Sequence, residues 1–188
     1  MERKFLKIII TGVFILALVV VSGQVAAQTV PEIDGDINAD EYRGSVETEI
    51  GMEVYWNNDE ENLYIGLTSP GEGWFAFGFQ PTLRMRDASI IIAAFEGGEP
   101  ELSIESHMGT SPTSHAETEE DFVADYSGTI TEDGEDDLQV LEFVIPFSED
   151  FIEGVEEGET YTLILAYHDS DKSFSARHTA RTAVEIEF

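Results

Sequence analysis

The sequence predicts an all-β protein, an antiparallel β-sandwich that follows an N-terminal secretory signal. Short runs in which apolar and polar residues alternate recur along the chain, and turn-forming residues separate them. No long stretch repeats at the helical period of about 3.6 residues. The pattern indicates about nine or ten short strands, which is typical of a sandwich.

The N-terminal segment has the three parts of a signal peptide. A basic region, "MERKFLK", is followed by the apolar run "IIITGVFILALVVVSG", which is short for a membrane span. The next residues, "QVAAQ", place Val25 and Ala27 at the −3 and −1 positions of a cleavage site. We expect residues 1–27 to be a signal peptide, with an uncleaved membrane anchor as the alternative. In both cases residues 28–188 form one extracytoplasmic domain, secreted or at the cell surface.

The strands are expected in the following order. "MEVYWNN" and "ENLYIGLTS" form a hairpin, and "GWFAFGFQP" places Trp74 and Ala76 on one face and Phe75 and Phe77 on the other. "ASIIIAAFE" and "ELSIES" flank a "GGEP" turn, and an Asp-Gly turn joins "DFVADYSGTIT" to "LQVLEFVIPF". "TYTLILAYHD" and "RHTARTAVEIEF" close the chain, and residues 107–121 are expected to be the longest loop.

Composition excludes several classes of function. The chain has 39 acidic and 9 basic residues, and its net charge of −30 repels nucleic acid and anionic lipid. The absence of cysteine excludes disulfides, thiolate metal sites, iron–sulfur clusters and covalently attached c-type haem. We find no Ser-His-Asp arrangement, H-E-x-x-H motif or glycine-rich phosphate loop. We therefore expect the chain not to be an enzyme by itself.

The few basic residues are not scattered evenly. Of the six that follow the signal, four flank one methionine or one histidine: Arg84 and Arg86 around Met85, and Arg177 and Arg181 around His178. If these two segments meet in space, the four arginines form a positively charged entrance to a site that contains a methionine and a histidine. Haem b suits such a site, because it offers two propionates to arginines and an iron to Met85 Sδ and His178 Nε2.

Four segments, taken in order, resemble a DOMON domain over about residues 30–188: "VPEIDGDINADEY", "VYWNNDEENLYIGL", "GWFAFGFQPTLRMRDASIIIAAF" and "HTARTAVEIEF". The resemblance implies an immunoglobulin-like β-sandwich of about 9–11 strands that binds haem or sugar. In haem-binding members an axial methionine follows the "GW.AFGF" strand, which corresponds to Met85, and an axial histidine begins the last strand, which corresponds to His178. The first segment is shared with the related family 9 carbohydrate-binding modules, so it does not separate the two functions.

Two functions follow from this. The first is an exported b-type cytochrome domain for one-electron transfer, because His/Met ligation leaves no open iron position. Its redox partner, a protein or a membrane cytochrome, stays unidentified. The second is a haem-free carbohydrate-binding module that uses Trp56, Trp74 and Tyr55 as a stacking platform, although such residues are more often sandwich core.

Other interpretations of the candidate ligands remain open. Met85 is also suited to filling a core. His168 is a rival ligand at the end of the preceding strand, whereas His107 and His115 are expected to be solvated in the long loop. The arginines are also able to pair with nearby acids such as Asp87 or Glu185.

Overall fold

The computed structural model describes residues 30–96, 101–133, 136–148 and 150–188. The expected signal peptide, the "GGEP" turn and the centre of the Asp-Gly turn lie outside these residues. In the described part of the chain, no helix is long and apolar enough to cross a membrane.

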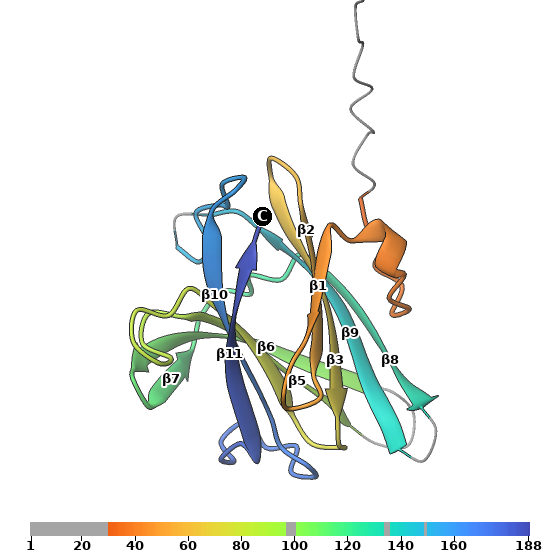
Figure 1. The fold of residues 1–188 in the computed structure, drawn as a ribbon. Coiled ribbons are helices and arrows are strands. Elements are labelled where there is room, and N and C mark those ends of the chain that lie inside the picture. Colours follow the sequence, from red (N-terminus) through yellow and green to blue (C-terminus); the bar gives the residue numbers. More distant parts are fainter. Residues whose placement is uncertain (1–29, 97–100, 134–135, 149) are drawn as a thin grey trace, which may run out of the picture.

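Two antiparallel sheets pack face to face, which confirms the predicted sandwich (Figure 1). In spatial order, the five-stranded sheet contains β1 (Gly44–Glu47), β2 (Glu53–Asn58), β3 (Asn62–Pro70), β9 (Asp136–Pro146) and β8 (Asp125–Asp133). The six-stranded sheet contains β11 (Ala180–Glu187), β10 (Thr160–Tyr167), β4 (Phe75–Phe79), β5 (Ser89–Glu96), β6 (Glu101–Ser111) and β7 (Ser114–Glu117). The helical structure among the described residues is one short 3-10 turn, η1 (Ala39–Glu41).

The core between the sheets follows from the alternation of side chains along each strand. Phe75 and Phe77 of β4 point into it, and the ring of Phe77 meets that of Phe143 of β9 edge to face, with centroids 5.6 Å apart. Burying such rings contributes the largest share of the apolar stabilisation. Trp74 and Ala76 face the outside of the sheet. The sequence predicts that these two residues share a face opposite to Phe75 and Phe77, but the interpretation of Trp74 as sandwich core was wrong.

The N-terminal segment is fastened to the outside of the five-stranded sheet by one buried carboxylate. Glu142 of β9 is fully buried and accepts hydrogen bonds from the Tyr42 hydroxyl at 2.7 Å and from the backbone N–H groups of Gly35 at 2.8 Å and Asp34 at 3.2 Å. Burial, followed by this contact with Glu142, raises the pKa of Tyr42, so the phenol stays protonated and continues to donate. Three donors compensate the cost of burying the carboxylate.

Two expectations about the strands were wrong. Residues 107–117 are not a loop: β6 continues to Ser111 and then turns back into β7. Hydrogen bonds to β5, in the register that pairs Ser89 with Met108, keep this polar stretch extended. The last strand begins at Ala180, after a bend at Thr179, so His178 precedes the strand instead of starting it.

Candidate functional site

A second apolar cluster lies on the outer face of the six-stranded sheet, away from the main core. Its buried members come from β4, β5 and the residues beside them: Trp74, Ala76, Ala88, Ile90, Ile92 and Ala94. In the strand register Arg181, Ala166, Ala76 and Ile92 stand side by side across four strands, with the arginine at the outer edge. The centre of this face is therefore an apolar surface of alanine and isoleucine side chains, and the cationic residue Arg181 lies at its edge.

Met85 reaches this cluster from the connection between β4 and β5, and its side chain packs against the cluster. The backbone N–H of Asp87 donates to the Gly109 carbonyl at 2.8 Å, and a Cβ at Gly109 would lie 1.6 Å from the Met85 carbonyl oxygen. A glycine on β6 is therefore required for the Met85 backbone to lie against the sheet.

The same connection is conformationally strained. Gln80, Arg84 and Asp87 adopt positive φ angles of 50°, 57° and 62°, and they are the non-glycine residues with positive φ among those the structure describes. This left-handed region is sparsely populated for residues with a Cβ, and such residues gather at sites with a function. The Thr82 hydroxyl donates to Asp87 Oδ2 at 2.5 Å, which holds the two ends of the turn together.

A second segment, between β10 and β11, covers the cluster as well. Phe174 and Ala176 pack against it, and the N–H of Thr179 donates to the Tyr167 carbonyl at 2.8 Å where the segment joins β11. The structure thus brings Met85 and the residues two and four positions before His178 onto one cluster. Ligation by Met85 and His178 as a pair stays a prediction.

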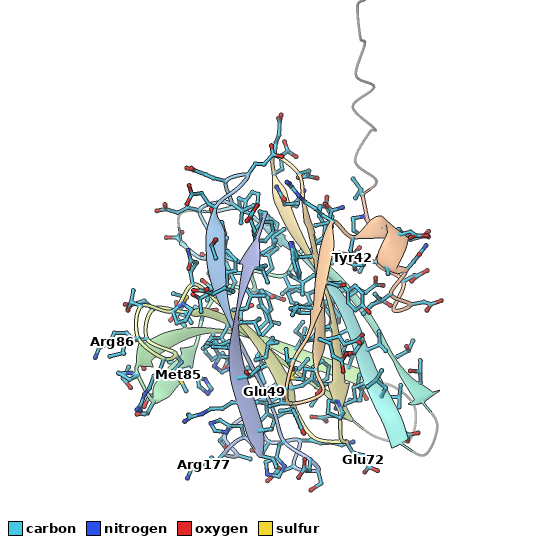
Figure 2. The ribbon with its side chains drawn as sticks, in the orientation of Figure 1. Tyr42, Glu49, Glu72, Met85, Arg86 and Arg177 are labelled. Atoms are coloured by element: carbon cyan, nitrogen blue, oxygen red, sulfur yellow. The ribbon has the colours of Figure 1, made fainter. Side chains whose placement is uncertain are left out.

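The four clustered arginines are exposed, and none of them has an acidic partner among the residues that the structure describes. Arg84, Arg86, Arg177 and Arg181 form no hydrogen bond through their side chains, and no ion pair, with any residue in the ranges described above. The pairing with Asp87 or Glu185 that the sequence allowed is absent there, although the chain is strongly acidic. Arg43, by contrast, pairs with Glu157 at 3.1 Å. Figure 2 shows Arg86 near β7 and Arg177 at the β10–β11 connection, both at the periphery of the fold.

The two candidate histidine ligands differ in their proton positions. His168 Nδ1 accepts hydrogen bonds from the N–H groups of Ser170 at 3.2 Å and Asp171 at 2.9 Å, so the neutral ring carries its proton on Nε2 and has no free lone pair. Burial, followed by the charges of Arg181 and Arg177, lowers the pKa of His178 below its ordinary value. His178 is therefore neutral at pH 7 and able to bind a metal.

Trp74 contributes an unsatisfied donor to the cluster. Its indole Nε1 is buried, and no acceptor lies within hydrogen-bonding distance in the described structure. Leaving a buried N–H unpaired costs about 1–3 kcal/mol, so an acceptor supplied by a ligand would be favourable here.

The three aromatic residues of the expected sugar platform do not share a surface. Trp56 is buried in the core between the sheets, and Tyr55, its neighbour in β2, points to the opposite face. Trp74 lies on the other sheet. The interpretation of Trp56 as sandwich core is confirmed, whereas an exposed stacking platform of these three residues was wrong.

A separate cavity of about 580 Å³ opens at one end of the sandwich. Its wall includes the stacked rings of Phe79 and Tyr161, with centroids 5.3 Å apart, and its polar groups include Gln80, Asp87 and Glu156. This volume lies within the range of small-molecule sites. Neither Met85 nor His178 lines it.

His107 and His115 are not solvated loop residues, which corrects the expectation from the sequence. His107 is 6% exposed on β6, and its ring contacts that of His115 on β7, with centroids 4.8 Å apart. The alternation of β6 places His107 on the outer face, beside Ile90 of β5. The polar sequence around them gave no sign of this burial.

No family model matches the chain, and no curated protein matches it. Among solved structures, the cytochrome b domain of pyranose dehydrogenase from Coprinopsis cinerea superposes with a TM-score of 0.57 at 9% identity, over 76% of this chain and 80% of that one. The chain has a DOMON-like fold. At this identity the likeness concerns the fold alone.

Two further structures are similar at lower scores. The cytochrome domain of Myriococcum thermophilum cellobiose dehydrogenase has a TM-score of 0.48 and 8% identity, covering 75% of this chain and 76% of that one. A family 9 carbohydrate-binding module from Caldicellulosiruptor kristjanssonii, in complex with cellotriose, has a TM-score of 0.43 and 11% identity, covering 81% and 78%.

Proposed function

We propose that this protein is an exported domain that binds haem b non-covalently between Met85 and His178 and transfers one electron at a time. The observation that carries the proposal is the apolar cluster on the outer face of the six-stranded sheet. The segment with Met85 covers it from one side, and the segment that leads to His178 covers it from the other. Four arginines, which have no acidic partner in the described part of the chain, flank these two residues.

The residues around the cluster suit the chemistry of haem. The small alanine side chains at the centre of the cluster leave room for the apolar haem macrocycle above the sheet. The arginines, which form no ion pair with any described residue, and the buried Trp74 Nε1 are donors that suit the two propionates. To admit a ligand of this size, Met85 and the segment with Phe174 must move apart. The turn that carries Met85 contains the non-glycine residues with positive φ among those the structure describes.

His178 suits iron better than His168 does. The lowered pKa keeps the His178 ring neutral, so a nitrogen lone pair is available at neutral pH. Ligation through His168 Nε2 would require the proton to leave that atom and both backbone hydrogen bonds to Nδ1 to break. That cost favours His178.

Met85 and His178 would hold the haem iron, which would supply one-electron redox chemistry and would have no position left for oxygen. The protein's own role is to hold, orient and shield the group, and we propose no catalysis by this chain alone. Its partner would be a redox protein or a membrane cytochrome. The acidic surface favours partners with a basic docking face.

A second candidate function, binding of a carbohydrate without haem, is favoured by the cavity at the end of the sandwich. Its stacked Phe79 and Tyr161 offer apolar ring surface, and Gln80 and Asp87 offer polar groups, which is the combination that a sugar ring requires. The site would then be this cavity, because the aromatic platform expected from the sequence is not formed.

Titration of the purified protein with haem, followed by visible absorption, tests the proposal. We expect saturation at one haem per chain and the sharp reduced bands of a six-coordinate b-type cytochrome. Met85→Leu and His178→Gln should each abolish those bands while far-UV circular dichroism stays unchanged. A protein that binds no haem, but whose unfolding temperature rises with cello-oligosaccharides, would support the second function instead.

A further inference from the structure

The outer surface of the β6–β7 hairpin carries three polar side chains in a chain of contacts. Glu105 Oε2 lies 2.9 Å from His107 Nε2, and His107 Nδ1 lies 3.0 Å from His115 Nδ1. The two ring planes are inclined at 75°, and the ring centroids lie 4.8 Å apart. Glu117 is the register partner of His107 and stands on the same face.

These contacts fix where the protons lie. A carboxylate only accepts hydrogen bonds, so the proton of a neutral His107 ring is on Nε2, where it is donated to Glu105. Its Nδ1 is then an acceptor that faces the Nδ1 of His115. A carboxylate that holds the far nitrogen of a histidine in this way is the usual arrangement behind a metal-binding ring.

We propose that His107 Nδ1 and His115 Nδ1 together bind one divalent transition-metal ion of the copper(II) or nickel(II) class. With metal–nitrogen bonds of about 2.05 Å, two nitrogens 3.0 Å apart subtend about 94° at the ion. That angle is close to the 90° between neighbouring ligands in the tetragonal geometry of copper(II) and nickel(II), and narrower than the tetrahedral angle of zinc.

The pair supplies two protein ligands and leaves the remaining positions open. No group of three histidine, cysteine, aspartate or glutamate side chains is already arranged for a metal in the part of the chain that the structure covers. Water fills the remaining positions, or Glu117 does so after a rotation of its side chain. Two nitrogens and an oxygen are a donor set that copper(II) accepts.

Binding at this pair requires little proton release. In the neutral pair, His115 Nδ1 donates its proton to His107 Nδ1. The proton on His115 Nδ1 moves to Nε2 when the ion takes its place, and the total number of protons on the ring is unchanged. The large negative charge of the chain also attracts divalent cations.

The proposed ion lies next to the candidate haem site but does not depend on it. Gly109, the register partner of His115, is the residue against which the Met85 carbonyl packs. The metal ligands belong to β6 and β7, whereas the proposed haem ligands belong to the two covering segments. Metal binding and haem binding are therefore separately measurable.

Titration of the purified haem-free protein with copper(II) chloride, against glycine as competitor, tests the proposal. We expect one tight ion per chain and an electron paramagnetic resonance signal split by two nitrogens. His115→Gln should remove that signal, and Glu105→Gln should weaken binding about 10–100-fold, because it disturbs only the orientation and basicity of His107. His168→Gln is the matched control and should bind copper as the wild type does.

Two results would overturn the inference. One is the same copper affinity in His115→Gln and in the wild type, which would place the ion elsewhere on the acidic surface. The other is the absence of bound copper at a copper concentration of about 100 µM, which is far above the dissociation constant expected of a specific site. Since His115 is half-buried on a short edge strand, its substitution should not unfold the protein, and circular dichroism checks this. Haem titration of the same variants tests the proposed haem binding separately from the metal site.

Discussion

Neutralising the two arginines around Met85 separates a ligand-binding role from a surface role. In Arg84→Gln/Arg86→Gln we expect the free energy of unfolding to stay within about 0.5 kcal/mol of the wild type, because both residues are exposed and neither has an acidic partner in the described structure. Haem affinity should fall. The change therefore appears in binding and not in stability.

The expected size of the loss follows from the exposure of these side chains. A hydrogen bond to a charged group contributes about 1.5–3 kcal/mol, but exposed ion pairs contribute only about 0–1 kcal/mol each. Two exposed contacts to propionates should together contribute about 1.4 kcal/mol, which is about a tenfold change in dissociation constant. The difference should shrink in about 1 M salt, where the screening length falls to about 3 Å.

The assay is haem titration by absorbance at low and high salt, with Arg43→Gln as the control. Arg43 is also a cation on the acidic chain, but it is paired with Glu157 and lies on the other sheet, beside β1. Its substitution should leave haem affinity unchanged. Equal affinities for the double variant and the wild type would refute the reasoning, and Arg84 and Arg86 would then be ordinary surface residues.

Three further predictions follow from particular contacts. Gly109→Ala places a Cβ where the Met85 carbonyl lies, so we expect a loss of about 1–3 kcal/mol in the free energy of unfolding and weaker haem binding, measured by urea denaturation and titration. Tyr42→Phe removes one of the donors to the buried Glu142 and should cost about 1–3 kcal/mol of stability without affecting haem affinity. Haem affinity should be constant above pH 6.5 and should weaken progressively below the lowered pKa of the free His178 ring, since protons then compete with iron for the same lone pair.

Each of these has an outcome that would contradict it. Normal stability in Gly109→Ala would mean that the turn with Met85 is loosely held. Tyr126→Phe is the control for Tyr42→Phe, because Tyr126 is exposed, and equal losses in the two variants would exclude a specific role for the contact with Glu142. A haem dissociation constant that stays the same from pH 7 down to about pH 4 would exclude His178 as the ligand.

The fold was predictable from the sequence in strands whose residues alternate in kind and that bury one of their two faces. In β4 the alternation of phenylalanine with small residues placed Phe77 in the core and Ala76 outside it, because neighbouring side chains in a strand must point to opposite faces. The β6–β7 hairpin was missed because its residues are polar. What keeps it extended is pairing with β5 and burial of His107 beside Ile90, which are tertiary effects.

The candidate site was predictable in composition but not in position. The clustering of arginines near Met85 and His178 is visible in the sequence, since so few basic residues are present. The approach of Met85 to the outer cluster depends on a turn with three left-handed residues, none of them glycine, and such a turn has no sequence signal. The wrong start of β11 has a similar cause, because the bend at Thr179 interrupts a pattern that would otherwise continue to His178.

The visible absorption spectrum of the purified protein, after addition of one equivalent of haem and reduction, decides whether Met85 and His178 bind haem. We expect a stable complex with the sharp α and β bands of a low-spin, six-coordinate b-type haem, and the loss of those bands in Met85→Leu and in His178→Gln. A spectrum that is indistinguishable from free haem, or bands that persist unchanged in both variants, would contradict this expectation.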